Sequence, residues 1–347
     1  MRTNDAQMLV LSALADGPLH GYGVNATIER MTGARLGRGS LSSALARLRD
    51  KGLVEQLEGE GRRRPLRLTE DGRATLEREL AALAEVTGRM FETAVPDRAG
   101  YLDRLAASDP GRSYKELALA ELDIRPGSLV LDLGCGPGAD LPALAAAAGP
   151  EGRVVAIDND PRMVRLARER TAGIGVVEVL QADVATLPLP DGCADRVHTD
   201  RLLQHVEDVP AVLEQAQRVL RPGGRLVMAE PDWDTLTLDH PDLEIARAYT
   251  RHIADRIVRN AVIGRQLHRL AAEQGFVVQQ VTAVTSVLRE LRAADQILGI
   301  QRNTERAVAA GYLTRQQADS LLGHLIQGPV FATVTLHITT ADLPQPE

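Results

Sequence analysis

The 347-residue sequence contains few aromatic residues and only two cysteines. Aromatic residues amount to 3% of the chain, which argues against a protein that binds nucleic acid by stacking bases on rings. Cys135 and Cys193 cannot build a disulfide framework or a cysteine-rich zinc site, and such scarcity is typical of the reducing cytoplasm. No apolar run approaches the roughly 18 residues of a membrane-spanning helix. We therefore expect a cytoplasmic protein with no membrane partner and, since the histidines lack the spacing of metal ligands, no metal.

Charge is unevenly distributed along the chain. The formal net charge is −7, yet residues 35–67 contain nine Lys and Arg against four Asp and Glu. A basic segment in an acidic protein indicates either a module that faces a polyanion or the solvated faces of ordinary helices and strands. Charge alone leaves both interpretations open.

The first 95 residues have the hydrophobic spacing of three short helices followed by a hairpin. Apolar residues recur at helical spacing in 8–14, 22–31 and 40–51, and we expect Ser40 to cap the third helix. Two extended segments flank a turn with three arginines, and a longer helix is expected from Thr69 to about Phe91. This order predicts a winged helix-turn-helix domain over residues 1–95.

Three phrases resemble the PadR family of transcription regulators: Gly17 to Gly23, Gly39 to Arg49, and Gly61 to Thr69. The resemblance implies a homodimer whose third helix enters the major groove of DNA while the arginine-rich wing contacts phosphates. The residues that it places on DNA are Ser42, Arg47, Arg62, Arg63 and Arg64. Because Ser42-Ser43 and Pro65-Leu66 depart from the family pattern, a winged helix that serves only for dimerisation is the alternative.

Residues 96–128 are expected to form two helices that connect the domains and cover a cofactor. Beyond them, short apolar runs alternate with helical segments at 129–133, 154–158, 176–180, 194–199 and 225–230. Such alternation predicts an α/β fold with a buried, Rossmann-like parallel sheet and helices on both faces. This domain is expected to span 129–347, with further helical sequence at 239–274, two closing strands, and a helical insertion at about 289–327 between them.

Three glycines follow the first of these strands, in the run Gly134-Cys135-Gly136-Pro137-Gly138. Glycine lets a backbone turn sharply and approach a ligand closely. Asp158 ends the next strand, where a carboxylate can accept hydrogen bonds from both hydroxyls of a ribose. Asp183 ends the third strand, where an acceptor side chain can bind an adenine amino group. A dinucleotide-binding fold shares Asp158, so these residues alone do not identify the cofactor.

The complete series of motifs resembles class I S-adenosylmethionine-dependent methyltransferases of the ubiquinone-biosynthesis type. Asp132 before the glycine turn belongs to the first motif, and 187–191, 202–208 and 220–226 match the later ones in order. The resemblance implies S-adenosyl-L-methionine as cofactor, with its methionine end at the turn, its ribose at Asp158 and its adenine at Asp183. The residues assigned to the cofactor are Asp132, Gly134, Cys135, Gly136, Gly138, Asp158, Asn159, Met163, Asp183, Val184 and Asp200.

The acceptor side is expected where the fourth and fifth strands end, because open α/β sheets bind ligands at their carboxyl edge. His205 is the predicted general base, with the alternative that it only frames the cofactor. The residues assigned to a small-molecule methyl acceptor are Tyr101, Tyr114, Arg201 and Trp233.

The sequence therefore predicts a methyltransferase of small molecules, with a winged helix for dimerisation or autoregulation. The alternative is a DNA-binding regulator whose methyltransferase-like half senses a ligand. Methylation of DNA or RNA is disfavoured, because the sequence lacks the Asn/Asp-Pro-Pro-aromatic motif expected for amino groups of bases.

Overall fold

The computed structural model describes residues 3–32, 35–57, 64–76, 78 and 98–345. Its contacts divide the chain into two compact units. We call Met1–Arg98, Thr237–Ile257 and Leu288–Ala332 the N-terminal unit, and Ala99–Leu236, Val258–Val287 and Thr333–Glu347 the sheet unit. The helices of the predicted insertion thus group with the N-terminal residues, while the domain boundaries at 95 and 128 stay predictions.

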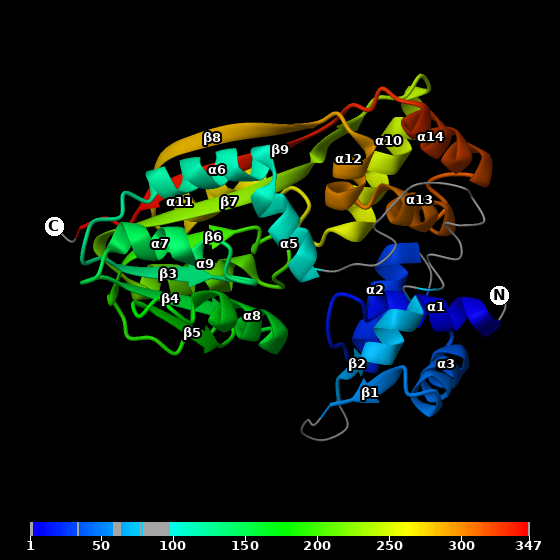
Figure 1. Ribbon diagram of the computed structural model, residues 1–347, viewed down its shortest axis with the longest axis horizontal. Coiled ribbons are helices and arrows are strands. Elements are labelled where there is room, and N and C mark those ends of the chain that lie inside the picture. The colour runs from blue at the N-terminus through cyan, green and yellow to red at the C-terminus, as the bar shows by residue number, and fades with distance from the viewer. Residues whose placement is uncertain (1–2, 33–34, 58–63, 77, 79–97, 346–347) are drawn as a thin grey trace. The chain divides into compact units, whose positions relative to one another are not determined.

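The N-terminal unit begins with three helices and a two-stranded wing (Figure 1). The elements are α1 (Thr3–Ala13), α2 (Gly21–Thr32), α3 (Arg38–Asp50), β1 (Val54–Gln56) and β2 (Leu66–Leu68). They bury a common apolar cluster that includes Val10, Ile28, Leu48 and Leu66. The two strands pair antiparallel, with Val54 opposite Leu68. This arrangement confirms the predicted winged helix-turn-helix.

The predicted cap of the third helix is wrong. α3 begins at Arg38 after the extended Gly37, and no side chain caps it. Because the chain becomes helical three residues earlier than a cap at Ser40 requires, Ser40 lies inside the first turn. Arg62, Arg63 and the expected joint at 95–97 lie outside the described residues, as does most of the helix expected after Thr69.

Further helical elements of the N-terminal unit come from its two later segments. They are α10 (Leu243–His252), the π-helical turn η1 (Ile253–Ile257), α12 (Leu291–Leu298), α13 (Ile300–Ala309) and α14 (Arg315–Gln327). A capping box of Thr314 and Gln317 starts α14, and Gly299, at φ +58°, turns the chain between α12 and α13. α2 contacts both η1 and α13, so the winged helix packs against these helices within one unit.

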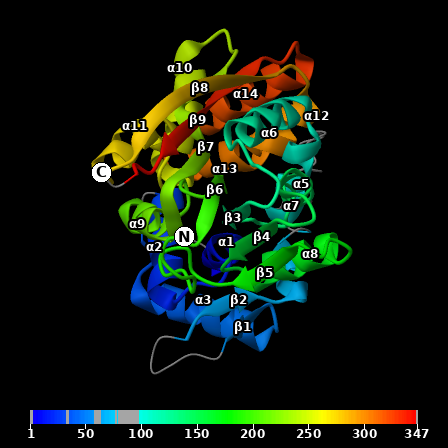
Figure 2. The same cartoon turned by 90° about the vertical axis from the view of Figure 1, so that its left-hand side faces the viewer.

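The sheet unit is built on seven strands. They are β3 (Leu129–Leu133), β4 (Arg153–Asp158), β5 (Val177–Gln181), β6 (Ala194–Asp200), β7 (Leu220–Leu238), β8 (Val277–Leu288) and β9 (Ala332–Asp342). Their order across the sheet is β5-β4-β3-β6-β7-β9-β8, and the labels in Figure 2 follow this order from β5 to β8. The pairs from β5 to β7 are parallel. The structure confirms the predicted α/β architecture.

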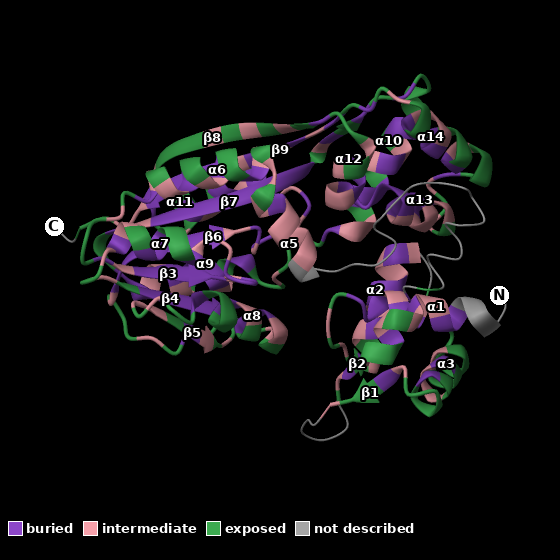
Figure 3. Cartoon of the chain, in the orientation of Figure 1, coloured by how far each residue is buried: buried purple, intermediate pink, exposed green. Residues whose placement is uncertain are grey.

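Helices cover both faces of this sheet. They are α5 (Arg98–Ala107), α6 (Asp109–Glu121), α7 (Leu141–Ala148), α8 (Pro161–Thr171), α9 (Val209–Val219) and α11 (Ile263–Glu273). Successive strand residues point to opposite faces, so Val130 packs with α6, α7 and α8 whereas Leu131 packs with α9 and α11. β3, β4 and β6 are therefore buried almost throughout (Figure 3), whereas β5 at the edge of the sheet is buried only at Val179. The carboxyl ends of these strands supply the site.

Two boundaries differ from the expectation. β7 runs from Leu220 to Leu238 rather than over 225–230, because it continues beside β9, with backbone bonds from Gly223 to Leu343 and from Asp239 to Phe331 at its two ends. The stretch expected to be helical over 239–274 is three separate pieces, α10, η1 and α11. Among the described residues, no helix has both the length and the apolar character needed to cross a bilayer.

Candidate functional site

The glycine turn lies between β3 and α7 and requires its glycines. Gly134, Gly136 and Gly138 have φ values of +71°, +54° and +78°, a region that side chains disfavour. A Cβ atom on Gly134 would come within 2.6 Å of Leu202 Cδ1, in the loop after β6. The absence of a side chain at Gly134 therefore allows the turn after β3 to pack closely against the loop after β6.

Asp158 joins this turn to the end of β4. Its carboxylate accepts hydrogen bonds from the Gly136 N–H at 2.9 Å and from the Asp160 N–H at 2.9 Å. Asp183, beyond β5, is exposed and accepts the Ala185 N–H at 2.9 Å. Both acids occupy the predicted edge of the sheet.

Asp132 lies within the sheet and pairs with a histidine that sequence reasoning missed. Its Oδ1 atom is 2.8 Å from Nδ1 of His198 on β6, and both side chains are buried. Burial alone would lower the pKa of His198, but the Asp132 carboxylate outweighs it and the pKa is raised. Burial raises the pKa of Asp132. The pair crosslinks β3 and β6 beneath the glycine turn.

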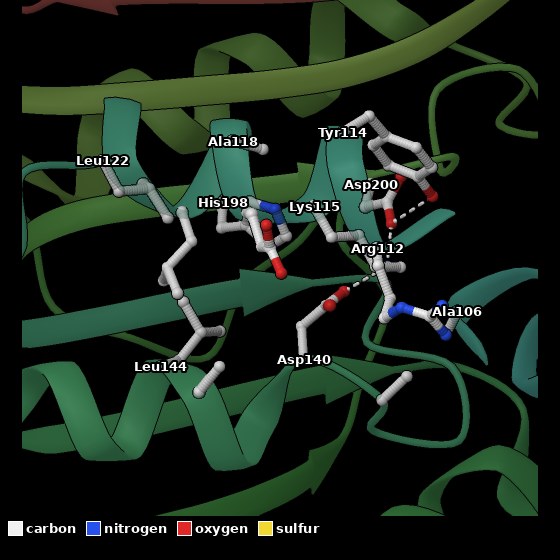
Figure 4. A pocket seen from close by; sticks show the side chains of 14 residues that line it. Ala106, Arg112, Tyr114, Lys115, Ala118, Leu122, Asp140, Leu144, His198 and Asp200 are labelled. Carbon is white, nitrogen blue, oxygen red and sulfur yellow. Dashed lines mark hydrogen bonds and ion pairs between the residues drawn. The ribbon is translucent and has the colours of Figure 1, made fainter. Parts of the chain in front are cut away.

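A cavity of about 170 Å³ opens between α6, the start of α7 and the end of β6 (Figure 4). Lys115 lies at its centre and makes ion pairs with Asp140 at 2.6 Å and with Asp200. The Tyr114 hydroxyl donates to Asp200 Oδ2 at 3.0 Å. Burial would raise the pKa of Asp200, but Lys115 outweighs it and the pKa is lowered. Two acids share one lysine here, so this wall of the cavity favours a cationic ligand.

The loop after β6 is fixed by a buried carboxyl group on β7. Glu230 accepts the N–H of Leu203 at 2.5 Å and that of Gln204 at 3.3 Å. The Gln204 side chain accepts the indole N–H of Trp233 at 2.8 Å and donates to the Arg201 carbonyl at 3.2 Å. Burial raises the pKa of Glu230 to about 8, so this carboxyl group is mainly protonated at neutral pH.

Arg201 lies between two aromatic rings. Its guanidinium carbon is 5.7 Å from the ring centroid of Tyr101 and 5.7 Å from that of Trp233. Nη2 donates to the Tyr101 hydroxyl at 2.6 Å. Arg201 also adopts φ +55°, which is unusual for a residue with a side chain. The structure therefore brings Tyr101, Arg201 and Trp233 together, and places Tyr114 beside the neighbouring Asp200.

The other predicted cofactor residues lie around the turn in different degrees of burial. Met163 and Val184 are buried, Asn159 is exposed, and Cys135 is half-buried, with a pKa that burial raises. His205 is exposed, and its backbone N–H bonds to the Leu202 carbonyl at 2.9 Å. Their contacts with ligands stay predictions. On α3, Ser42 and Arg47 are exposed, as is Arg64 before β2.

Lys115, His198 and Gln204 contribute to the site without having been predicted. Lys115 is one of several basic residues on a polar helix, and only the packing of α6 places it against Asp200. His198 lies on β6, whose sequence from Ala194 to Asp200 is mostly polar, so no local pattern identified it as a buried side chain. Among the described residues, no group of three or more His, Cys, Asp or Glu side chains is placed to hold a metal ion.

Comparisons with known proteins agree with this architecture. A model described as "Methyltransferase domain" matches residues 124–294, and one described as "Transcriptional regulator PadR-like family" matches residues 10–78. An uncharacterized 37.1 kDa protein in transposon TN4556 of Streptomyces fradiae is 60% identical over 341 residues, which cover 98% of this chain and 99% of that protein.

More distant similarities concern the sheet unit. A demethylmenaquinone methyltransferase of Staphylococcus aureus is 30% identical over 152 residues, which cover 44% of this chain and 63% of that enzyme. A solved SAM-dependent methyltransferase from Aquifex aeolicus has a TM-score of 0.42 at 19% identity, over 69% of this chain and 92% of that one.

Fold, glycine turn and family models together define the class: a methyltransferase domain, matched over residues 124–294, is joined to a PadR-like winged helix, matched over residues 10–78. Within that class, it belongs to the family of the transposon-encoded Streptomyces fradiae protein, which it matches over nearly its full length.

Proposed function

We propose that the sheet unit binds S-adenosyl-L-methionine at the glycine turn and transfers its methyl group to a small molecule. The observation that carries this proposal is the close junction of Gly134, Gly136 and Asp158 at the carboxyl edge of a parallel sheet. Bound there, the cofactor supplies an already activated methyl group.

The chain's own residues then have distinct tasks. Asp158 binds the ribose, Asp183 and Val184 frame the adenine, and the cavity at Lys115 receives the methionine end. The loop fixed by Glu230 presents Arg201 and Trp233 to the acceptor. Alignment of nucleophile and methyl group is the main contribution expected of the protein, on the order of 7–11 kcal/mol in favourable cases.

Titration calorimetry with S-adenosylhomocysteine tests this proposal. Wild type should bind, and Asp158→Asn should bind at least roughly tenfold more weakly, because hydrogen bonds to a charged group contribute about 1.5–3 kcal/mol. Asp208→Asn is the matched control, since Asp208 caps α9 by accepting the Ala211 N–H and is exposed. Unchanged affinity in the Asp158 variant would contradict the ribose assignment, and failure of wild type to bind would contradict the proposed function.

His205 is proposed as the general base for acceptors that must lose a proton. Its exposed position allows it to exchange protons with solvent. If it has this role, His205→Gln should lower kcat and remove an acidic limb from the pH–rate profile while leaving cofactor affinity unchanged. An unaltered profile would leave His205 with a framing role only.

The winged helix supports a second candidate function, regulation through DNA binding. Ser42 and Arg47 are both exposed on α3, the helix that would enter the major groove, and Arg64 is exposed beside the wing. A gel-shift assay with the gene's upstream DNA should show retardation that Arg47→Ala weakens and that salt reduces. The control is Arg269→Ala on α11. Retention of the dimer without any retardation would favour a dimerisation module instead.

A further inference from the structure

The guanidinium group of Arg201 is a buried charge that makes no direct ion pair in the part of the chain that the structure describes. Arg201 is 9% exposed, and its Nε atom has no hydrogen-bond partner. Among the residues that the structure describes, no carboxylate lies within ion-pair distance of it: Asp200 acts on Arg201 from further away and pairs directly with Lys115 and Tyr114. Burying an unpaired charge is costly, so buried charges are ordinarily paired with a protein group or with a ligand.

Three features show that this arginine is held in place. Its backbone adopts φ +55°, and its N–H bonds to the Ala229 carbonyl at 2.9 Å. Gln204 donates to its carbonyl oxygen at 3.2 Å and is itself tied to Trp233. Strained backbone that surrounding contacts maintain is typical of binding sites. That the surrounding contacts keep Arg201 in an unfavourable backbone conformation indicates that its position matters to a ligand.

The surroundings of the guanidinium indicate the shape of that ligand. Tyr101 and Trp233 each have a ring centroid 5.7 Å from Cζ of Arg201, and the Trp233 indole N–H is already used by Gln204. Trp233 therefore offers an aromatic face rather than a donor. Flat aromatic walls around a planar fork of donors suit a flat, conjugated molecule with an anionic oxygen.

The position also places such a ligand beside the methyl donor. Leu202, the next residue, is the side chain against which a Cβ on Gly134 would clash. Arg201 therefore directly precedes the residue that packs against the glycine turn. A methionine carboxylate of the cofactor is aliphatic and gains little from two aromatic faces, whereas an acceptor with a conjugated ring gains from both.

We propose that Arg201, Tyr101 and Trp233 form a clamp for a planar methyl acceptor that carries an oxyanion, such as an aromatic carboxylate or a phenolate. This inference rests on the proposed methyltransferase function and names the substrate class. Nε of Arg201 and the Nη2 atom now bonded to Tyr101 donate to the oxyanion.

Fluorescence tests the clamp directly, because Trp233 is the sole tryptophan of the sequence. Benzoate and its neutral isostere benzamide serve as probes, each titrated into the full chain saturated with S-adenosylhomocysteine. Benzoate should change the emission saturably, and benzamide should bind at least about tenfold more weakly, as expected for loss of a charged hydrogen-bond partner.

Variants separate the contributions. Arg201→Met should weaken benzoate about 10- to 100-fold, and Arg201→Lys, which keeps the charge but not the planar fork, should be intermediate. Tyr101→Phe frees Nη2 from its present partner and should strengthen benzoate. Arg269 on α11 forms an ion pair only with the exposed Glu273 among the described residues, so Arg269→Met should bind benzoate as wild type does. Circular dichroism identifies any variant that fails to fold, and the lysine variant then carries the test.

The outcomes distinguish this inference from the proposed function. Equal binding of benzoate and benzamide, or no binding of benzoate by a protein that binds S-adenosylhomocysteine, overturns the clamp but leaves the methyltransferase proposal intact. If Arg201→Met loses affinity for S-adenosylhomocysteine itself in calorimetry, the guanidinium serves the cofactor carboxylate, and the acceptor clamp is overturned. Absence of S-adenosylhomocysteine binding by wild type defeats the proposed function instead.

Discussion

The sheet unit buries Glu230 and the N-terminal unit buries His252, and both side chains are 0% exposed. Glu230 accepts two backbone N–H groups, whereas neither ring nitrogen of His252 has a hydrogen-bond partner. The imidazole instead lies edge-to-face with Tyr312 at 5.2 Å. Glu230 orders a loop that carries candidate acceptor residues, while His252 packs against the ring of Tyr312.

The two side chains also ionise with opposite consequences for pH dependence. Burial raises the pKa of Glu230 from its ordinary 4.5 to about 8 and lowers that of His252 from 6.5 to about 4. Both groups therefore favour their neutral forms in the folded protein. The comparison teaches that one chain contains a unit sensitive to base and a unit sensitive to acid.

The largest expected effect belongs to Glu230. Its folded pKa is raised, so the stability of the sheet unit is complete below about pH 4.5 and is lost as the pH rises through about 8. The loss is on the order of 3–5 kcal/mol. Denaturant unfolding followed by Trp233 emission should show this slope, and Glu230→Gln should flatten it. Glu273→Gln, at an exposed position of α11, is the control. If the free energy of unfolding depended on pH equally in both variants, Glu230 would not be the source of the base sensitivity.

A neutral change at the glycine turn should affect the sheet unit alone. Gly134→Ala places a Cβ within 2.6 Å of Leu202 at a positive φ, so we expect a loss of about 2–4 kcal/mol and of S-adenosylhomocysteine binding. Gly173→Ala is the matched control, because a Cβ there meets nothing within 4 Å. Hydrogen exchange should show peptides of α10 and α13 unchanged. Equal stability of the two variants would contradict the steric argument.

His252 should give the N-terminal unit the opposite pH dependence. Its folded pKa is depressed, so its contribution is complete above about pH 6.5 and is lost as the pH falls through about 4, by roughly 2–3 kcal/mol. Hydrogen exchange in α10 and α13 should accelerate over this range in wild type and change less in His252→Leu. If acid opened the sheet unit first, the assignment of acid sensitivity to His252 would be wrong.

The smallest expected change in the free energy of unfolding comes from an exposed ion pair and serves as a reference for the effects of the buried groups. The exposed pair between Arg269 and Glu273 spans four residues on α11. Arg269→Ala should therefore cost only about 0.3–0.5 kcal/mol, and added salt should remove even that difference. A larger change would show that exposed charges influence the sheet unit as strongly as the buried ones do.

Much of the fold was predictable because it depends on short-range patterns. The runs at 129–133 and 154–158 are apolar over the length of a strand. The glycines between them predict a turn whatever the surrounding tertiary structure is. The winged helix was predictable for the same reason. β7 was underestimated because its second half is polar, and its partner β9 lies about a hundred residues away.

The candidate site was predictable only in part. Residues that follow strands, such as Asp158 and Arg201, could be placed because the carboxyl ends of parallel strands meet at one edge. Lys115 comes from a helix outside the strand series, and its pairing with Asp140 and Asp200 depends on how α6 packs. No local pattern records that packing.

By itself, the sequence determined the order of strands and helices, the glycine turn and the acids that follow it, because these depend on hydrophobic period and backbone freedom over a few residues. Only the tertiary structure decided that His198 would face Asp132, that Arg201 would lie between Tyr101 and Trp233, and that the helices of 291–327 would group with the winged helix. The physical reason is that burial and pairing of polar groups arise between segments far apart in the chain, where neighbours in space are set by packing rather than by adjacency.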